Sequence, residues 1–221
     1  MRTHTKDFQQ NLTPADAYEV LKEGNQRFVN NLKVNRNLLE QMNETAAGQY
    51  PFAVVLSCMD SRTAVELIFD QGIGDIFSIR IAGNVVNDDI IGSMEYACQV
   101  AGSKLVVVLG HSRCGAIRGA CDNVELGKLT GLLEKVNPAI EKTSAAKNQI
   151  SPEEYVEVVA QANVLNSMDE ILERSSIIHS LYSEGKIGIA GGLYNIETGK
   201  VSFIKKMFAG QEKKEDALTT A

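Results

Sequence analysis

The sequence predicts an α/β fold: a mainly parallel central β-sheet flanked by helices, with a helical N-terminal arm and a late antiparallel edge strand. Short apolar runs that are rich in valine, at 52–58 (FAVVLSC) and 104–110 (KLVVVLG), are typical of strands buried on both faces. Segments with helical patterning separate these runs, and alternating strands and helices favour a parallel sheet. The 221-residue chain shows no internal repeat and no Pro/Gly/Ser-rich linker, so one domain is expected over residues 1–209.

The first 48 residues are expected to form the helical arm. Thr13 is followed by Pro14, which matches an N-cap residue with proline at the first helical position. A stripe of apolar residues at helical spacing follows, formed by Ala17, Val20, Leu21 and Phe28. One such stripe cannot build a core by itself, so this segment is expected to be an arm or a cap.

Strands and helices are expected to alternate through the rest of the chain. The expected strands are 52–58, 75–81, 104–110, 186–190 and 201–204, with a turn at 195–199. The expected helices are 63–70, 88–101, 114–125, 129–142 and 151–174. Gly102 suits the end of the second of these helices, because glycine tolerates the backbone conformation found there. Residues 210–221 are charged and poor in bulky side chains, so this tail is expected to be disordered.

Composition and charge exclude several classes of protein. The net charge is −6 and no basic stripe is present, which argues against a nucleic-acid or anionic-membrane partner. The apolar run at 105–109 is too short to cross a bilayer. The first ten residues are polar and lack the apolar core of a signal peptide, so a cytoplasmic location is expected. In such a chain the four cysteines are expected to be thiols or metal ligands rather than disulfides.

Chemically active side chains follow two of the expected strands. Residues 58–62 read CMDSR, and residues 111–115 read HSRCG. Ligands of open parallel sheets bind beyond the carboxyl ends of the strands. If the two strands are neighbours, one edge of the sheet collects two thiols, an imidazole, a carboxylate and a guanidinium.

Cys58, His111 and Cys114 form a candidate metal site. Two thiolates and an imidazole favour zinc over magnesium or calcium, and the fourth position of a tetrahedral ion is left for water or Asp60. A structural zinc is an alternative, although structural sites usually have four protein ligands held close in sequence. Cys98 and Cys121 are expected to be ordinary apolar residues.

Together the two segments resemble the β-class carbonic anhydrases. The resemblance runs from about Tyr18 to Ile204 and includes residues 80–84, RIAGN, where Ile81 and Gly83 depart from the commonest form of the family. It implies that Cys58, His111 and Cys114 bind Zn²⁺ and that the protein hydrates CO2 to bicarbonate. Since two thiolates cancel the formal charge of the ion, activity is expected to favour mildly alkaline pH.

The resemblance also implies roles for residues around the metal. Asp60 and Arg62 are implied to be catalytic, because Arg62 holds Asp60 away from the metal and Asp60 ligates only in a closed state. The implied substrate-binding residues are Gln49, Phe77, Ala82, Tyr96 and Gly115. In the family, Gln49, Phe77 and Tyr96 come from the partner subunit, so a homodimer is expected, pairing into a dimer of dimers.

Some alternatives stay open. The same site could hydrate CS2 or COS, or the chain could be a non-catalytic zinc-stabilised interaction or redox module. No Cys-x-x-Cys motif supports the redox role.

A second open point is regulation by bicarbonate. Some β-class enzymes are shut by bicarbonate held by an Arg, a Tyr and a Trp. Arg80 and Tyr194 are possible counterparts, but the chain has no Trp and Gln49 stands at that place. The sequence therefore predicts the open-site, type I-like subgroup, the alternative being that Arg80 and Tyr194 trap an anion without Trp.

Overall fold

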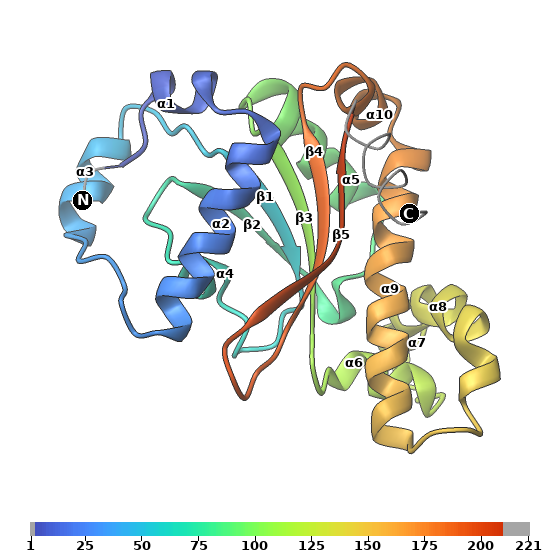
Figure 1. Ribbon diagram of the computed structural model, residues 1–221. Helices are drawn as coiled ribbons and strands as arrows, with labels where there is room; N and C mark the ends of the chain where they lie inside the picture. The colour runs from blue at the N-terminus through green and yellow to red at the C-terminus, as the bar shows by residue number, and fades with distance from the viewer. Residues whose placement is uncertain (1–2, 210–221) are drawn as a thin grey trace, which may run out of the picture.

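The computed structural model describes residues 3–209, and the predicted disordered tail at 210–221 lies outside the described residues. Within this range five strands form one sheet in the order β2-β1-β3-β4-β5 (Figure 1). The strands are β1 (Ala53–Ser57), β2 (Ile76–Arg80), β3 (Leu105–His111), β4 (Gly188–Tyr194) and β5 (Val201–Phe208). The pairs β1–β2, β1–β3 and β3–β4 are parallel, and β5 is antiparallel to β4. The predicted fold class, with its late antiparallel edge strand, is confirmed.

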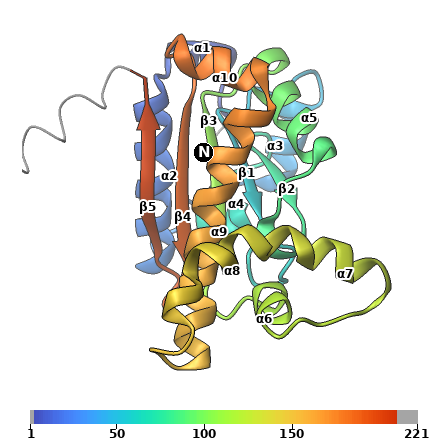
Figure 2. The same ribbon diagram turned by 90° about the vertical axis from the view of Figure 1, so that its right-hand side faces the viewer.

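Helices cover both faces of this sheet (Figures 1 and 2). They are α1 (Lys6–Asn11), α2 (Pro14–Val29), α3 (Leu38–Thr45), α4 (Val65–Ile68), α5 (Asp88–Glu95), α6 (Gly115–Cys121), α7 (Gly127–Leu133), α8 (Asn137–Thr143), α9 (Pro152–Arg174) and α10 (Ser176–Ser183). One face packs against α2 and α4, and the other against α5, α9 and α10. None of the helices within residues 3–209 combines the length and apolar character needed to cross a membrane.

The strands alternate their side chains between two cores. Ala53 and Val55 of β1 face the core that includes α2, whereas Val54 and Leu56 face the core that includes α9. All four side chains are fully buried, as expected for a parallel sheet covered on both sides. The short valine-rich runs thus form strands that have no polar face.

Helix α2 begins as the sequence predicts and belongs to one of these layers. The Thr13 side chain accepts a hydrogen bond from the Asp16 amide, and Asp16 accepts one from the Thr13 amide. Ala17 and Leu21 are fully buried against the sheet. The N-terminal arm therefore supplies part of the core of the domain.

Asn25 of α2 ties this helix to the far end of the chain. Its amide group donates to the carbonyl oxygens of Ile68 (3.1 Å) and Gly199 (2.9 Å). Its carbonyl oxygen accepts from the amide of Val201 at 2.8 Å. The side chain is 5% exposed, so these bonds satisfy polar atoms that water cannot reach.

Several predicted elements differ from the observed ones for local reasons. The helix expected at 63–70 is only α4, because Asp70 adopts a left-handed conformation with φ of 47°. The helix expected at 88–101 is α5 followed by a π-helical segment, Tyr96–Val100. The strand expected at 186–190 is β4, which continues through Gly191; a Cβ there would lie 2.5 Å from the Met168 sulfur of α9. Helix α10 was not predicted.

Asp70 is the centre of a buried ion cluster. It is 3% exposed and accepts hydrogen bonds from Arg27 Nε (2.6 Å), Arg36 Nη1 (2.5 Å) and the Val34 amide (3.3 Å). Burial alone would raise the pKa of this carboxyl, but the hydrogen bonds from the two arginines leave it below its usual value. The cluster fixes the loop after α2 against the end of α4.

Asp70→Asn is expected to lower the free energy of unfolding by about 3 kcal/mol at pH 7.5, because two guanidinium groups lose their anion. A carboxyl whose pKa is depressed by folding stabilises the protein above its unfolded pKa of about 4, and this contribution is lost as pH falls through the folded value. Urea unfolding should therefore show the gap between wild type and variant narrowing below about pH 4. An equal difference in the free energy of unfolding between wild type and variant at pH 7.5 and below about pH 4 would contradict this role.

Candidate functional site

The three predicted metal ligands lie together at one edge of the sheet. Strands β1 and β3 are neighbours, so Cys58, which follows β1, lies beside His111 at the end of β3. Cys114 comes from the turn between β3 and α6. The ligand atoms of Cys58, His111 and Cys114 all lie within 4.8 Å of one another, and the residues are 4%, 1% and 1% exposed. We call these residues the Cys–His–Cys cluster.

The imidazole of His111 is oriented with one nitrogen toward the cluster. Its Nδ1 lies 2.9 Å from the carbonyl oxygen of Ser112. A carbonyl can only accept, so Nδ1 carries the proton and Nε2 has a free lone pair. Among the described residues Nε2 is buried and has no hydrogen-bond partner. A buried nitrogen lone pair beside two thiols is a donor set that suits zinc.

The two thiols lie close enough to share one proton. The sulfur atoms of Cys58 and Cys114 are 3.9 Å apart. The hydrogen bond from Cys114 lowers the pKa of Cys58, and the same bond raises the pKa of Cys114. The Gly83 amide also lies 3.4 Å from Cys58 Sγ, where it can donate to a thiolate. A metal cation would replace the shared proton with a charge that both sulfur atoms can bind.

Asp60 and Arg62 form a two-point ion pair next to the cluster. Arg62 Nε donates to Asp60 Oδ1 at 2.9 Å, and Nη2 donates to Oδ2 at 2.7 Å. These bonds hold the pKa of the Asp60 carboxyl well below its usual range. Asp60 is therefore ionised, and its orientation is set by Arg62.

Arg80 and Thr63 hold the turn that carries Cys58 and Asp60. Arg80 donates to the carbonyl oxygens of Cys58 (3.2 Å) and Asp60 (2.5 Å). The Thr63 hydroxyl lies 2.8 Å from each of the same two carbonyl oxygens, to either of which its one proton can be donated. Tyr194 lies opposite His111 in the β3–β4 register, and burial raises its pKa. Arg80 thus has a structural task in the cluster, which the sequence does not reveal.

The predicted substrate-binding residues fall into two groups. Ala82 and Gly115 lie close to the cluster, since Ala82 precedes Gly83 and Gly115 follows Cys114 as the first residue of α6. Their neighbourhood suits contacts with a small molecule at the cluster, because Gly115 places a helix N-terminus there.

The other three predicted residues have their described contacts with residues outside the cluster. Phe77 and Tyr96 contact each other edge to face, with ring centroids 6.2 Å apart. Phe77 pairs with Val54, three residues before the end of β1, so it lies about 10 Å back from the cluster edge. Gln49 is exposed and lies near Gly74, before the start of β2.

Two residues of α9 that are absent from the predicted site bond to residues beside the Cys–His–Cys cluster. Asn163 Nδ2 donates to the carbonyl oxygen of Gly83 at 2.9 Å. Glu157 Oε1 accepts from the Arg113 amide at 2.7 Å. The detectable signal is a buried amide among apolar neighbours: Asn163 is 3% exposed between Val159 and Val164, which are fully buried.

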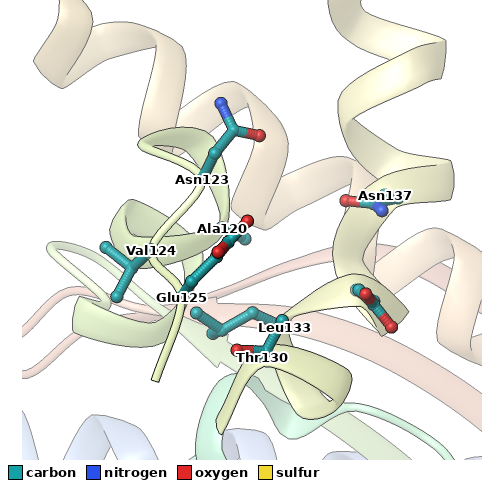
Figure 3. Close-up of a pocket in the computed structure, with 8 residues that line it drawn as sticks. Ala120, Asn123, Val124, Glu125, Thr130, Leu133 and Asn137 are labelled. Carbon is teal, nitrogen blue, oxygen red and sulfur yellow. The ribbon is translucent and has the colours of Figure 1, made fainter. Parts of the chain in front are cut away.

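Of the pockets between described residues, one lies away from the predicted site residues and another borders them. Figure 3 shows one of about 170 Å³ between α6 and α7. Its lining residues are Ala120, Asn123, Val124, Glu125, Thr130, Leu133, Glu134 and Asn137. A pocket of about 620 Å³ is lined by Cys114 and Gly115 and so borders the Cys–His–Cys cluster.

Comparisons with known proteins agree with this arrangement. A family model described as carbonic anhydrase matches residues 53–201. Carbonic anhydrase 2 of Mycobacterium tuberculosis is 36% identical over 86% of this chain and 92% of that protein. A carbonic anhydrase of Mycolicibacterium smegmatis is 33% identical, with 86% and 93% covered.

Solved structures show the same fold. A β-carbonic anhydrase of Aspergillus fumigatus superposes with a TM-score of 0.71 at 28% identity, covering 76% of this chain and 81% of that chain. A tetrameric β-carbonic anhydrase of Sordaria macrospora superposes with a TM-score of 0.70 at 26% identity, covering 75% and 87%.

Proposed function

The chain belongs to the β-class carbonic anhydrases, and on this premise we propose that it catalyses the zinc-dependent, reversible hydration of CO2 to bicarbonate and a proton. The observation that carries the proposal is the buried Nε2 lone pair of His111 between two thiols. Cys58, His111 and Cys114 would hold the ion. When bound, Zn²⁺ supplies a Lewis acid that lowers the pKa of a water molecule from about 15.7 toward neutrality.

The remaining chemistry belongs to residues of this chain. Asp60 accepts a hydrogen bond from the attacking water and so directs a lone pair toward the carbon of CO2. Arg62 keeps Asp60 in that role by occupying both carboxylate oxygens. The Gly115 amide, at the start of α6, donates to the oxygen on which negative charge develops. Ala82 contributes an apolar contact to CO2.

We further propose that the site is completed by a second copy of the chain, which supplies Gln49, Phe77 and Tyr96. Phe77 lies about 10 Å from the cluster edge of its own chain. Tyr96 is 55% exposed and Val100 of the same π-helical segment is 70% exposed, so this segment offers apolar surface that a second copy could cover. A related enzyme of S. macrospora is tetrameric, and a dimer of dimers is the assembly proposed for this chain.

The test of the proposed function is stopped-flow CO2 hydration on protein of known zinc content. Catalysis with one zinc per chain is the expected result. Faster turnover of COS or CS2 than of CO2 would favour the alternative substrates, and an inert protein with full zinc would favour a non-catalytic zinc-stabilised module. The cytoplasmic location stays a prediction.

An open site is the expected state near neutral pH. Crystals grown near pH 7, with and without bicarbonate, are expected to keep Asp60 paired with Arg62. The physical reason is that Arg62 bonds both oxygens of Asp60, while Arg80 bonds the carbonyls of Cys58 and Asp60. An anion beside Arg80 together with Asp60 on the metal would show instead that the anion pocket works without Trp.

A further inference from the structure

Two turns with left-handed residues hold the cysteines of the Cys–His–Cys cluster in place. In the turn Ala82–Asn84, Gly83 has φ of 68° and Asn84 has φ of 44°. In the second turn, Arg113 lies between the ligands His111 and Cys114 and has φ of 54°. Non-glycine residues at such angles persist only when their surroundings hold them there.

Asn163 of α9 holds the first turn. Its Nδ2 donates to the carbonyl oxygen of Gly83 at 2.9 Å, and the amide of the same Gly83 points to Cys58 Sγ at 3.4 Å. The side chain is 3% exposed among apolar neighbours, where an amide without a partner is costly. Because the buried amide of Asn163 needs this partner, its side chain is held in one orientation. The bond to the Gly83 carbonyl in turn fixes the Gly83 amide, which is the donor that faces the Cys58 sulfur.

Glu157 of α9 holds the second turn. Its Oε1 accepts from the Arg113 amide at 2.7 Å. A carboxylate is a strong acceptor for a backbone amide, so this bond stabilises the left-handed residue between the two ligands. The Arg113 guanidinium is directed elsewhere, since it pairs with Glu197 at 2.6 Å.

Helix α9 can hold both turns in fixed positions because it packs tightly on the sheet. A Cβ on Gly110, next to His111 in β3, would lie 2.8 Å from Val164 Cγ2. A Cβ on Gly191 of β4 would lie 2.8 Å from Val164 Cγ1. Because Gly110 and Gly191 carry no side chains, α9 packs close to strands β3 and β4. This close packing fixes the position of α9 relative to the Cys–His–Cys cluster.

We propose that Asn163 and Glu157 are positioning residues for the metal centre, each fixing from α9 a left-handed turn next to a metal-ligating cysteine. The inference rests on the proposed function, because it concerns the affinity and geometry of the zinc site. Partners of this kind, outside the ligands, typically change metal affinity by about 10–100-fold when removed.

The test measures zinc affinity by competition with a chelator and geometry from the visible absorption spectrum of Co²⁺-substituted protein. Asn163→Leu keeps the branching of the side chain at Cγ and removes the donor to Gly83. Glu157→Met removes the acceptor for Arg113, whereas Glu157→Gln keeps one. Asn166→Leu is the matched control, since Asn166 lies on α9 and accepts from Lys142.

Asn163→Leu and Glu157→Met are expected to weaken zinc binding about 10–100-fold and to shift the Co²⁺ spectrum, while Glu157→Gln and Asn166→Leu stay near wild type. Wild-type affinity and spectrum in both affected variants would overturn the inference, as would an equal loss in Asn166→Leu, which would indicate general destabilisation of α9. If Asn163→Leu does not fold, the test rests on the half-buried Glu157. The comparison is then between the zinc affinity and Co²⁺ spectrum of Glu157→Met and those of Glu157→Gln. A wild-type protein that binds no zinc would contradict the proposed function instead.

Discussion

Cys58→Ser is expected to lose zinc and CO2 hydration together. The serine hydroxyl is a poor replacement for a thiolate, and the two remaining ligands, His111 and Cys114, leave the site with one negative charge fewer. Metal analysis after dialysis should show little zinc, and stopped-flow rates should fall to the uncatalysed background. His111→Ala is expected to behave in the same way, because it removes the oriented Nε2 lone pair.

The control for this experiment is Cys121→Ser. Cys121 is a half-buried thiol at the end of α6, and burial raises its pKa, so it has little thiolate character. This variant is expected to keep its zinc and its rate. Full zinc content in Cys58→Ser would show that the metal site has been assigned to the wrong residues.

Arg62→Ala is expected to keep zinc and lose about 100-fold or more in CO2 hydration. An aspartate without a partner has a pKa near 4, so Asp60 stays ionised at neutral pH when Arg62 is removed. The loss therefore comes from freedom of movement: a carboxylate next to the cluster can take the fourth position of the ion and exclude water.

Three measurements check this expectation. Zinc content should match wild type, the hydration rate should collapse, and the visible spectrum of the Co²⁺-substituted variant should report a changed ligand set. Arg118→Ala serves as the control, because Arg118 is a half-buried arginine of α6 that pairs with Glu153 rather than with Asp60. Near wild-type turnover in Arg62→Ala would remove the proposed gating role.

Local sequence patterns predict the parts of this protein that depend on near neighbours. The valine-rich runs at β1 and β3 predict fully buried strands because both faces must be apolar. The predicted ligands meet because the carboxyl ends of neighbouring parallel strands share one edge. The sequence alone therefore predicts that Cys58 and His111 lie close together.

The parts that could not be predicted depend on contacts between distant segments. Asn163 and Gly83 are 80 positions apart, and no local pattern marks the bond between them. Helix α4 ends before the left-handed residue Asp70, whose carboxylate is held by Arg27 and Arg36 from far upstream. The π-helical segment at Tyr96–Val100 is likewise a register change that composition does not encode.

The bonds of Asn25 have a consequence for the order in which the protein can fold during synthesis. Its partner Val201 lies 176 positions further along the chain, so a ribosome adding about 5–20 residues per second needs on the order of 10 seconds to supply it. Until then the carbonyl oxygen of Asn25 lacks its native donor, and the sheet lacks its antiparallel edge. The apolar face of α2 is therefore synthesised long before Val201 and Phe208 of β5, which belong to the same core, and it can pack only in part while the rest of the chain emerges.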